Sequence, residues 1–302
     1  MALKQVVILS GKGGTGKTNI AAGFAHLAAA GPLPRKAVLA DADVDASNLS
    51  LVLQAQIIER HVFTSGKVAV IDPNRCQDCG ICETVCRFNA VLPPGSSGSS
   101  RYRIDPIACD GCAACVYQCP EEAVQMEEQT GGHWFRSASS CGPLFHAELR
   151  PAQDNSGKLV TIVKQQARLL ALDSEAQMVI VDGPPGTGCP VISAASGADL
   201  VLIVAEPTAA GIHDLERVLH LVQHFHLQAV VCINKADLYT GGARQIEAFC
   251  QQENIQMMGH VPFDPAVPLA MAAGQPVTAY RPDAPASRAI AGLWARTAEM
   301  LT

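Results

Sequence analysis

VVILSGKGGTGKT, residues 6–18, joins an apolar run to a glycine-rich turn and decides the fold of this chain. The segment Gln5–Leu9 predicts a buried strand, and Thr18–Ala30 predicts an alanine-rich helix directly after the turn. The turn matches G-x-x-x-x-G-K-T, in which backbone N–H groups surround phosphate oxygens and the helix N-terminus adds a favourable potential. A strand, this turn and a helix in succession predict a P-loop nucleotide site.

The turn supplies most of the candidate nucleotide ligands. Lys17 is expected to reach the β- and γ-phosphates, and the Thr18 hydroxyl is expected to bind Mg²⁺. Lys12 is a second lysine in the same turn. Glycine lets the backbone turn inward onto phosphate oxygens, so the other expected contacts are Gly11, Gly13, Gly14, Thr15 and Gly16.

Strand-like and helix-like segments alternate through most of the chain, which is typical of α/β proteins with a parallel sheet. We therefore predict a doubly wound, mostly parallel sheet with helices on both faces. Further strands are expected at residues 37–40, 178–181, 199–205, 229–233 and 255–261, and further helices at residues 159–172 and 212–224.

Between Ile71 and Val124 the sequence repeats itself after 33 residues, and each copy carries C-x2-C-x2-C-x3-C. This spacing is that of bacterial two-cluster ferredoxins, in which three thiolates of one turn bind one cube and the fourth binds the other. We expect two [4Fe-4S] clusters with crossed ligands. The first set is Cys76, Cys79, Cys82 and Cys119, and the second set is Cys109, Cys112, Cys115 and Cys86.

Two other uses of eight cysteines are weighed against this hypothesis. Zinc sites usually pair two C-x2-C knuckles across a longer gap, and disulfides need an oxidising compartment that nothing in the sequence supports. One departure from the ferredoxin pattern is Arg87, which follows Cys86, whereas Pro120 follows Cys119. The departure affects the expected loop geometry and leaves the number of ligands unchanged.

The repeat also predicts the domain organisation. A small α+β ferredoxin domain is expected at residues 71–124, inserted into a discontinuous P-loop domain at residues 1–70 and 125–302. The glycine- and proline-rich residues 92–100 predict a loop within the insert. After the insert, residues 155–158 are interpreted in two ways, with Ser156 as a helix N-cap or with Gly157 and Lys158 as a hinge or anion contact.

Lys12 and Lys17 together make the glycine-rich turn resemble the deviant Walker A motif of MinD/ParA/Mrp and nitrogenase Fe-protein ATPases. In that family the extra lysine reaches the partner's phosphates, so the resemblance implies an ATP-dependent homodimer. With the cysteine repeat included, the chain resembles a MinD-superfamily P-loop ATPase that contains an inserted ferredoxin domain. The resemblance implies ATP or ADP and Mg²⁺ as ligands, ATP hydrolysis as the activity, and Lys12 and Lys17 as catalytic residues.

The resemblance continues at the expected end of the second strand. There Asp43 corresponds to the residue that orients the attacking water, which makes it a third candidate catalytic residue. Asp41 is expected near the metal, and Asn48 also matches the family pattern as a nucleotide contact.

Two later segments carry the same resemblance. Residues 178–188, MVIVDGPPGTG, resemble the switch segment, in which Asp182 would bind a water of the Mg²⁺ ion. Residues 261–265 resemble the loop that wraps the nucleotide base, which makes Pro262 and Asp264 candidate nucleotide contacts.

Residues 234–237 spell N-K-x-D directly after an expected strand. In GTPases the aspartate of this motif accepts hydrogen bonds from guanine, which would make Asp237 a base reader. The alternative is that Asn234 hydrogen-bonds adenine and that Lys235 and Asp237 are incidental. We favour ATP, because the deviant Walker A lineage is ATP-specific with few exceptions.

The composition excludes several function classes. The chain of 302 residues has a formal net charge of −6 and no long basic run, so no nucleic-acid partner is expected. No apolar stretch reaches membrane-spanning length, and the N-terminus lacks signal-peptide features, so a cytoplasmic protein is expected. Residues 286–301 predict an amphipathic helix with few basic residues, which favours packing on the core over membrane binding.

Four cysteines lie outside the repeat, at unrelated spacings. Burial in the core is the expected role of Cys141, Cys189, Cys232 and Cys250. Cys189 is the one with a second possibility, a redox or dimer-interface role, because it follows the segment that contains Asp182.

A P-loop ATPase and two low-potential clusters in one chain suggest that nucleotide hydrolysis is coupled to electron transfer. The expected partner is a redox protein or a metal-cofactor carrier. Two alternatives stay open: a regulatory switch, in which ATP and redox state set dimerisation or partner docking, and an ATPase for metal-cluster assembly or delivery. A carrier must release its cluster, whereas full cysteine ligation favours permanent electron-transfer centres.

Overall fold

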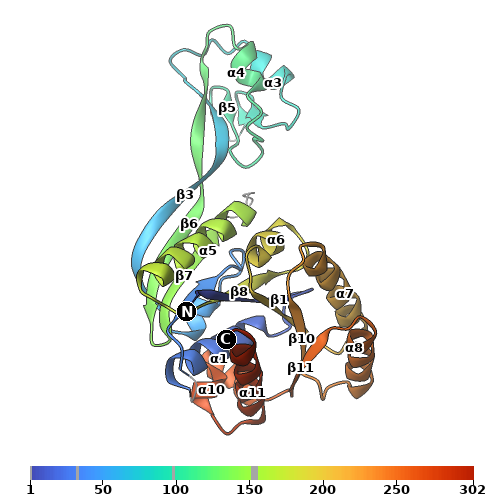
Figure 1. The fold of residues 1–302 in the computed structure, drawn as a ribbon. Helices are drawn as coiled ribbons and strands as arrows, with labels where there is room; N and C mark the ends of the chain where they lie inside the picture. Colours follow the sequence, from blue (N-terminus) through green and yellow to red (C-terminus); the bar gives the residue numbers. More distant parts are fainter. Residues whose placement is uncertain (1, 32–33, 97–98, 151–155) are drawn as a thin grey trace. The chain divides into compact units, whose positions relative to one another are not determined.

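The computed structural model describes residues 2–31, 34–96, 99–150 and 156–302 (Figure 1). The chain divides into two compact units, each with its own apolar core. The first unit comprises Met1–His61, His133–Glu148 and Ser156–Thr302, and the second comprises Val62–Gly132 with Leu149–Asn155. The second unit is longer than the insert expected at residues 71–124, because two long strands continue past both ends of the cysteine repeat.

The six expected strands are all present in the sheet of the first unit, and they pair in parallel with one another. They are β1 (Lys4–Ser10), β2 (Ala37–Asp41), β8 (Met178–Pro185), β9 (Leu200–Ala205), β10 (Ala229–Asn234) and β11 (Gln256–Val261). The strands β8 and β9 flank β1, β10 lies between β9 and β11, and β2 pairs with β8, all in parallel. This arrangement confirms the mostly parallel α/β sheet.

Helices cover both faces of this sheet. Successive side chains of a strand point to opposite sides, so the apolar strands present a hydrophobic surface on each face. Val6 and Ile8 of β1 share a buried cluster with Phe24 of α1 (Lys17–Ala30) and Trp294 of α11 (Pro285–Met300). The small helices α2 (Leu49–Val52), α9 (Ala266–Ala272) and α10 (Val277–Tyr280) pack near these two. The other face carries α5 (Ser156–Asp173), α6 (Cys189–Ala195), α7 (Ala209–His224) and α8 (Thr240–Gln252) (Figure 1).

Three strands extend the sheet beyond the expected six. They are β7 (Gly142–Leu149), β6 (Val124–Ser139) and β3 (Gln56–Ile71), and the full order is β11-β10-β9-β1-β8-β2-β7-β6-β3. The β7 strand pairs in parallel with β2, where Leu39 lies opposite Leu144. Each of β3 and β6 contributes residues to both units, so the chain leaves the sheet along one strand and returns along its neighbour.

The second unit reproduces the sequence repeat as a structural repeat. Each copy has one short helix, α3 (Ile81–Thr84) or α4 (Ala114–Gln118), and one short strand, β4 (Val91–Leu92) or β5 (Arg103–Ile104), and the two strands pair antiparallel. Within the loop expected at residues 92–100, positions 97 and 98 lie outside the described residues, and Leu92 belongs to β4.

Several smaller predictions have clear outcomes. Cys141, Cys232 and Cys250 are buried as expected, but Cys189 is exposed at the start of α6, so its assignment to core packing is wrong. The expected C-terminal helix is α11, and its apolar stripe is buried against the core. In the described part of the chain, no helix has both the length and the apolar character needed to cross a membrane.

Ser156 is the first residue of α5, and Asn155, which precedes it, lies outside the described residues. The interpretation of residues 155–158 as a cap or a hinge therefore stays a prediction.

Candidate functional site

The phosphate-binding turn follows β1 and ends at Lys17, the first residue of α1. Gly16 has a φ of 94°, in the left-handed region, and a Cβ at this position would lie 2.2 Å from Asn234 Nδ2. That amide donates a hydrogen bond to the Thr15 carbonyl oxygen at 2.7 Å. Glycine is required here both for the backbone conformation and for the close approach of the end of β10.

Lys17 and three carboxylates meet where β1, β2 and β8 end. The Lys17 side chain is buried, and burial lowers the pKa of its ammonium group while Asp182, Asp43 and Asp41 oppose the change. Asp41 and Asp182 lie opposite each other across β2 and β8. The structure therefore brings together candidate residues from three separate motifs.

Asp182 is the member of this group that best fits a metal ion. Its side chain is 1% exposed, and burial followed by the nearby Asp41 charge raises its pKa well above the usual range. The Thr18 hydroxyl favours the charged form, yet among the described residues neither carboxylate oxygen makes a hydrogen bond of normal geometry. A buried carboxylate without a partner is destabilising, and Mg²⁺ or one of its bound waters would provide that partner. Asp182 and the Thr18 hydroxyl offer the oxygen ligands that Mg²⁺ prefers.

Asp41 has a different environment. One carboxylate oxygen accepts the Asp43 N–H at 3.1 Å, and the other accepts the Ser47 hydroxyl at 2.8 Å and the Leu49 N–H at 3.0 Å. Burial raises the pKa of Asp41 to about 6 despite these bonds. The carboxylate therefore holds the loop that carries Asp43, a structural role that the sequence did not predict.

The loop held by Asp41 carries two further candidates. Asp43 is half-buried, and burial raises the pKa of its carboxyl group while the charge of Lys17 lowers it. Asn48 is exposed at the start of α2, where its side chain makes no capping hydrogen bond. Asp43 thus belongs to the charged group around Lys17, and Asn48 is a surface residue in this structure.

Lys12 is held within its own chain by an acidic residue that the sequence analysis missed. Its Nζ atom lies 2.8 Å from Glu206 Oε2 and donates to Thr208 Oγ1 at 3.2 Å. The other oxygen of Glu206 lies 2.8 Å from Lys235 Nζ, which also donates to the Gly14 carbonyl at 3.1 Å. Burial would raise the pKa of Glu206, but the two lysines more than offset it and keep the pKa low. The available signal was its position directly after a buried parallel strand.

The N-K-x-D residues contact the phosphate-binding turn and the late loop. Asn234 and Lys235 donate to backbone carbonyls of the turn, as described above. Asp237 Oδ1 accepts the Phe263 N–H at 2.6 Å, which fixes the carboxylate beside residues 261–265. The motif therefore has a definite architectural use, whichever base the site accepts.

The structure gives Asp264 a role other than base binding. One of its carboxylate oxygens accepts the Ala266 N–H at 2.9 Å, and the other accepts the Ala286 N–H at 3.1 Å. These groups lie at the N-terminal ends of α9 and α11, where helices leave N–H groups unpaired. Asp264 thus anchors two helices, while Pro262 is half-buried in the loop itself.

The eight cysteines of the repeat gather around two small cavities in the second unit. Four of them line one cavity, namely Cys76, Cys79, Cys82 and Cys119. The other four line the second cavity, namely Cys86, Cys109, Cys112 and Cys115. Each cavity therefore combines three cysteines of one repeat with the last cysteine of the other.

Backbone N–H groups point at cysteine sulfurs in matching positions of the two repeats. The Ala90 N–H donates to Cys86 Sγ at 3.4 Å, and the Ala123 N–H donates to Cys119 Sγ at 3.3 Å. Such bonds are among the features that set the reduction potential of an iron–sulfur cluster. Burial raises the pKa of the Cys82 thiol to about 11, so a positively charged group would be needed to hold it as a thiolate.

The spacing around these cavities also bears on the size of the group they would hold. Among the described residues, no three His, Cys, Asp or Glu side chains converge closely enough to bind a single metal ion. A cube of iron and sulfide is larger than one ion, so its thiolate ligands lie farther apart than those around one zinc. Each cavity offers four thiols, the donor set that one such cube takes.

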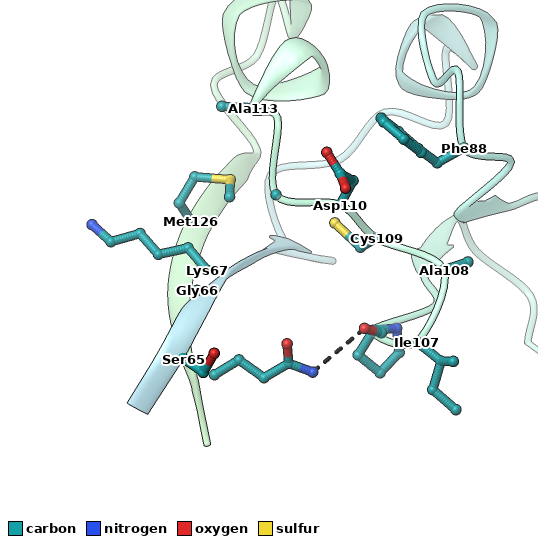
Figure 2. A pocket seen from close by; sticks show the side chains of 13 residues that line it. Ser65, Gly66, Lys67, Phe88, Ile107, Ala108, Cys109, Asp110, Ala113 and Met126 are labelled. Carbon is teal, nitrogen blue, oxygen red and sulfur yellow. Dashed lines mark hydrogen bonds between the residues drawn. The ribbon is translucent and has the colours of Figure 1, made fainter. Parts of the chain in front are cut away.

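A third cavity, of about 550 Å³, lies beside Cys109 in the second unit (Figure 2). Figure 2 shows Cys109, Asp110 and Phe88 on one side of this pocket and Met126 on the other. Gly111, in the same wall, has a φ of 74°, and a Cβ there would lie 2.4 Å from the Lys67 carbonyl oxygen. The cysteine turn is thus packed directly on β3.

The model of the CobQ/CobB/MinD/ParA nucleotide-binding domain matches residues 6–277, which include the turn, the carboxylates and the N-K-x-D residues. The chain belongs to this family. Its fold agrees: a structure of the septum site-determining protein MinD with Mg-ADP, from Pyrococcus horikoshii, superimposes with a TM-score of 0.56 at 17% identity, covering 98% of this chain and 96% of that one. The family member described here is a P-loop nucleotide-binding protein of the MinD/ParA type.

Two relatives in sequence extend the comparison. The Methanocaldococcus jannaschii protein MJ0578 is 28% identical over 239 residues, which are 77% of this chain and 78% of that protein. A cytosolic Fe-S cluster assembly factor, NBP35 of Eremothecium gossypii, is 31% identical over 136 residues, which are only 38% of this chain and 40% of that protein.

Proposed function

We propose that this protein is an ATP-hydrolysing iron–sulfur protein that couples nucleotide-dependent dimerisation to electron transfer through two [4Fe-4S] clusters. The observation that carries the proposal is the pair of cavities lined by four cysteines each. The last cysteine of each repeat lines the cavity of the other repeat, which a two-cluster ferredoxin requires and two independent zinc knuckles would not.

The residues around the phosphate-binding turn have the chemistry for hydrolysis. Lys17 would offset the charge of the β- and γ-phosphates, Thr18 and Asp182 would hold Mg²⁺, and Asp43 would orient the attacking water. When bound, Mg²⁺ would neutralise charge that develops on the phosphate oxygens. The Mg-ADP in the Pyrococcus MinD structure supports a magnesium nucleotide as the ligand of this fold.

In the proposed dimer, Lys12 would cross to the phosphates of the partner subunit. Support for this comes from the resemblance of its motif to the deviant Walker A sequence. The move would first have to break the ion pair between Lys12 and Glu206. Lys235 would remain with Glu206, so the carboxylate would keep one cationic partner after Lys12 leaves.

The second unit would serve as the electron-transfer part. When bound, each cluster would accept and release one electron at a time. The chain itself would supply eight thiolates and the two N–H groups of Ala90 and Ala123 that donate to sulfur. A redox partner would dock beside Cys109, because the side chains of Ile107 and Phe88 are 72% and 42% exposed next to that cavity.

A second candidate function is the assembly or delivery of an iron–sulfur cluster. The partial likeness to the assembly factor NBP35 favours it. The two candidates differ in how firmly the clusters are held, because a carrier must release its cluster to an acceptor. Ligation of each proposed cluster by four cysteines favours permanent centres and therefore electron transfer.

Redox titration tests the coupling. If reduction of a cluster tightens ATP binding tenfold, ATP must raise the reduction potential by about 59 mV for one electron, since linkage is reciprocal. We expect a non-hydrolysable ATP analogue to shift the potential of at least one cluster by tens of millivolts relative to ADP. The measurement is electron paramagnetic resonance of anaerobic protein poised at known potentials. Superimposable titrations would contradict coupling, and rapid transfer of iron to an apo-acceptor would favour delivery.

ATP should bind more tightly than GTP. The Asp43→Ala protein, which is expected to bind nucleotide without hydrolysing it, allows both to be compared by isothermal titration calorimetry. Asp237→Ala in the same background should change ATP affinity by less than about threefold, because the aspartate's hydrogen bond to Phe263 N supports the loop and reads no base. A tenfold preference for GTP, lost on Asp237→Ala, would instead make Asp237 the base reader.

A further inference from the structure

A cavity of about 470 Å³ in the first unit has no part in the site described above. Residues of α5, α6 and the start of β1 line it, including Gln5, Thr161, Lys164, Gln165, Arg168 and Ser193. Gln5 is the second residue of β1, whereas the phosphate-binding turn follows the last residue of that strand. The cavity therefore lies at the end of the parallel strands opposite to the nucleotide site.

The lining is rich in positive charge and hydrogen-bond donors. Lys164 and Arg168 are cations, and Gln5 contributes a primary amide. None of the described residues that line the cavity is acidic. Asp199, which accepts the Gln5 backbone N–H at 2.7 Å, is not among them and lies 3.6 Å from Lys4. An anion would therefore meet two cations of α5 and the amide of Gln5, and no carboxylate among the described lining residues.

Lys164 is the most buried cation of the cavity, at 8% exposure. Its Nζ atom donates to the Ser193 carbonyl at 2.7 Å and to the Ser196 carbonyl at 2.6 Å, at the C-terminal end of α6. Helix capping explains these two bonds. An ammonium has three N–H donors, so one remains beyond those that the described residues use. Burial lowers the pKa of Lys164 to about 8, which leaves it mostly protonated at neutral pH.

Gln5 gives an independent indication of a ligand. Its side chain is 3% exposed, and its Nε2 atom has no hydrogen-bond partner among the described residues. A buried amide without a partner is destabilising unless a ligand or an ordered water accepts its N–H. Capping of α6 by Lys164 does not account for this amide.

We propose that this cavity binds a small anionic molecule through a carboxylate or phosphate group, with Lys164, Arg168 and Gln5 as the contacting residues. Its volume falls in the range of small-molecule sites, about 300–1,000 Å³. Hydrogen bonds between cationic donors and anionic oxygens are roughly twice as strong as neutral ones. The ligand would also contact α6, the helix that follows the segment from Asp182.

Isothermal titration calorimetry of the full chain with citrate and with inorganic phosphate tests the proposal. The protein is first saturated with a non-hydrolysable ATP analogue, with Mg²⁺ in excess over the added anion, so that both the β- and γ-phosphate positions of the phosphate-binding turn are filled. Arg168→Gln should weaken binding about threefold, since its side chain is exposed. Lys164→Met should weaken it by about tenfold or more. The control Arg288→Gln removes an arginine that is also exposed, on α11, and should leave binding unchanged.

The two anions distinguish the sources of the ligand group. Tighter binding of citrate identifies a ligand with a carboxylate group, and tighter binding of phosphate identifies a phosphorylated ligand. Either result supports the proposed site. Absence of binding by either anion to the wild-type protein would overturn the proposal. So would equal effects of Arg168→Gln and Arg288→Gln, a comparison that stays decisive even if Lys164→Met does not fold.

Discussion

Replacing Lys17 by Ala should abolish measurable ATP binding and hydrolysis. The Lys17 ammonium is the buried cation at the phosphate-binding turn, and three carboxylates surround it. Without it, the β- and γ-phosphates would face Asp41, Asp43 and Asp182, because the other lysine of the turn, Lys12, is paired with Glu206. Binding of ATP by calorimetry and release of phosphate are the measurements. We expect a loss of at least about a thousandfold in affinity, of the order of 4 kcal/mol.

The matched control is Lys4→Ala, at the other end of β1. Lys4 lies 3.6 Å from Asp199 and is partly exposed, so its loss removes the same charge without touching the turn. Lys4→Ala should bind ATP as the wild-type protein does. ATP affinity of Lys17→Ala within threefold of wild type, in protein with a cooperative thermal transition, would show that the turn is not the phosphate site.

Replacing Cys112 by Ala should remove about half of the iron from anaerobically purified protein, from about eight atoms per chain to about four. Cys112 lines the cavity shared with Cys86, Cys109 and Cys115, and none of these lines the other cavity. Because Cys112 is exposed, its replacement opens no apolar core, and the first unit should keep its fold. Iron and sulfide assays with electron paramagnetic resonance give the result.

Two further variants sharpen this test. Cys79→Ala, the equivalent change in the other repeat, should also halve the iron but remove the other cluster's signal. Cys189→Ser changes an exposed cysteine outside both cavities and should leave iron unchanged. Stoichiometric zinc with little iron in the wild-type protein, purified without oxygen, would contradict the ferredoxin hypothesis.

The parallel core could be predicted because each of its strands is a short apolar run between helical segments. β1, β8 and β9 are buried on both faces, and each contains a continuous apolar run, at residues 6–9, 178–181 and 200–205, that marks the strand in the sequence. The phosphate-binding turn could be found because its glycines are needed for its backbone. The cysteine sets followed from spacing alone, since a turn of this length cannot fold its fourth cysteine back.

The long strands could not be predicted in the same way. β3 reads QIIERHVFTSGKVAVI and mixes exposed apolar residues with a glycine and charges, whereas β6 reads VQMEEQTGGHWFRSAS and carries charges and two adjacent glycines. No single face of either strand is buried throughout, so the alternation of period two that marks a half-buried strand is absent. In the sheet β3 lies beside β6, which is far along the chain, and local sequence does not reveal that pairing; β6 also lies beside β7, which follows it directly in the sequence.

Within the site, sequence reasoning located charged groups but not their partners. Asp41 and Asp264 were predicted as ligand contacts, yet each uses both oxygens to hold backbone N–H groups or a hydroxyl. Glu206 belongs to no motif and was missed, although it pairs with both Lys12 and Lys235. A motif specifies residue types, and only the fold shows which of these side chains already have a hydrogen-bond or ion-pair partner within the chain.

The pairing of Lys12 with Glu206 has a consequence for the concentration at which two copies would associate. Only molecules with Lys12 detached are competent to place it in a partner, so the apparent dissociation constant rises as that fraction falls. In a dimer both subunits must release Lys12, so the factor by which the apparent dissociation constant rises is squared. If a partly exposed ion pair contributes about 1 kcal/mol, the factor is about fivefold per subunit and about 25-fold for the pair. The Glu206 carboxylate, directly after β9, would thus set a protein concentration below which nucleotide-bound chains remain monomeric.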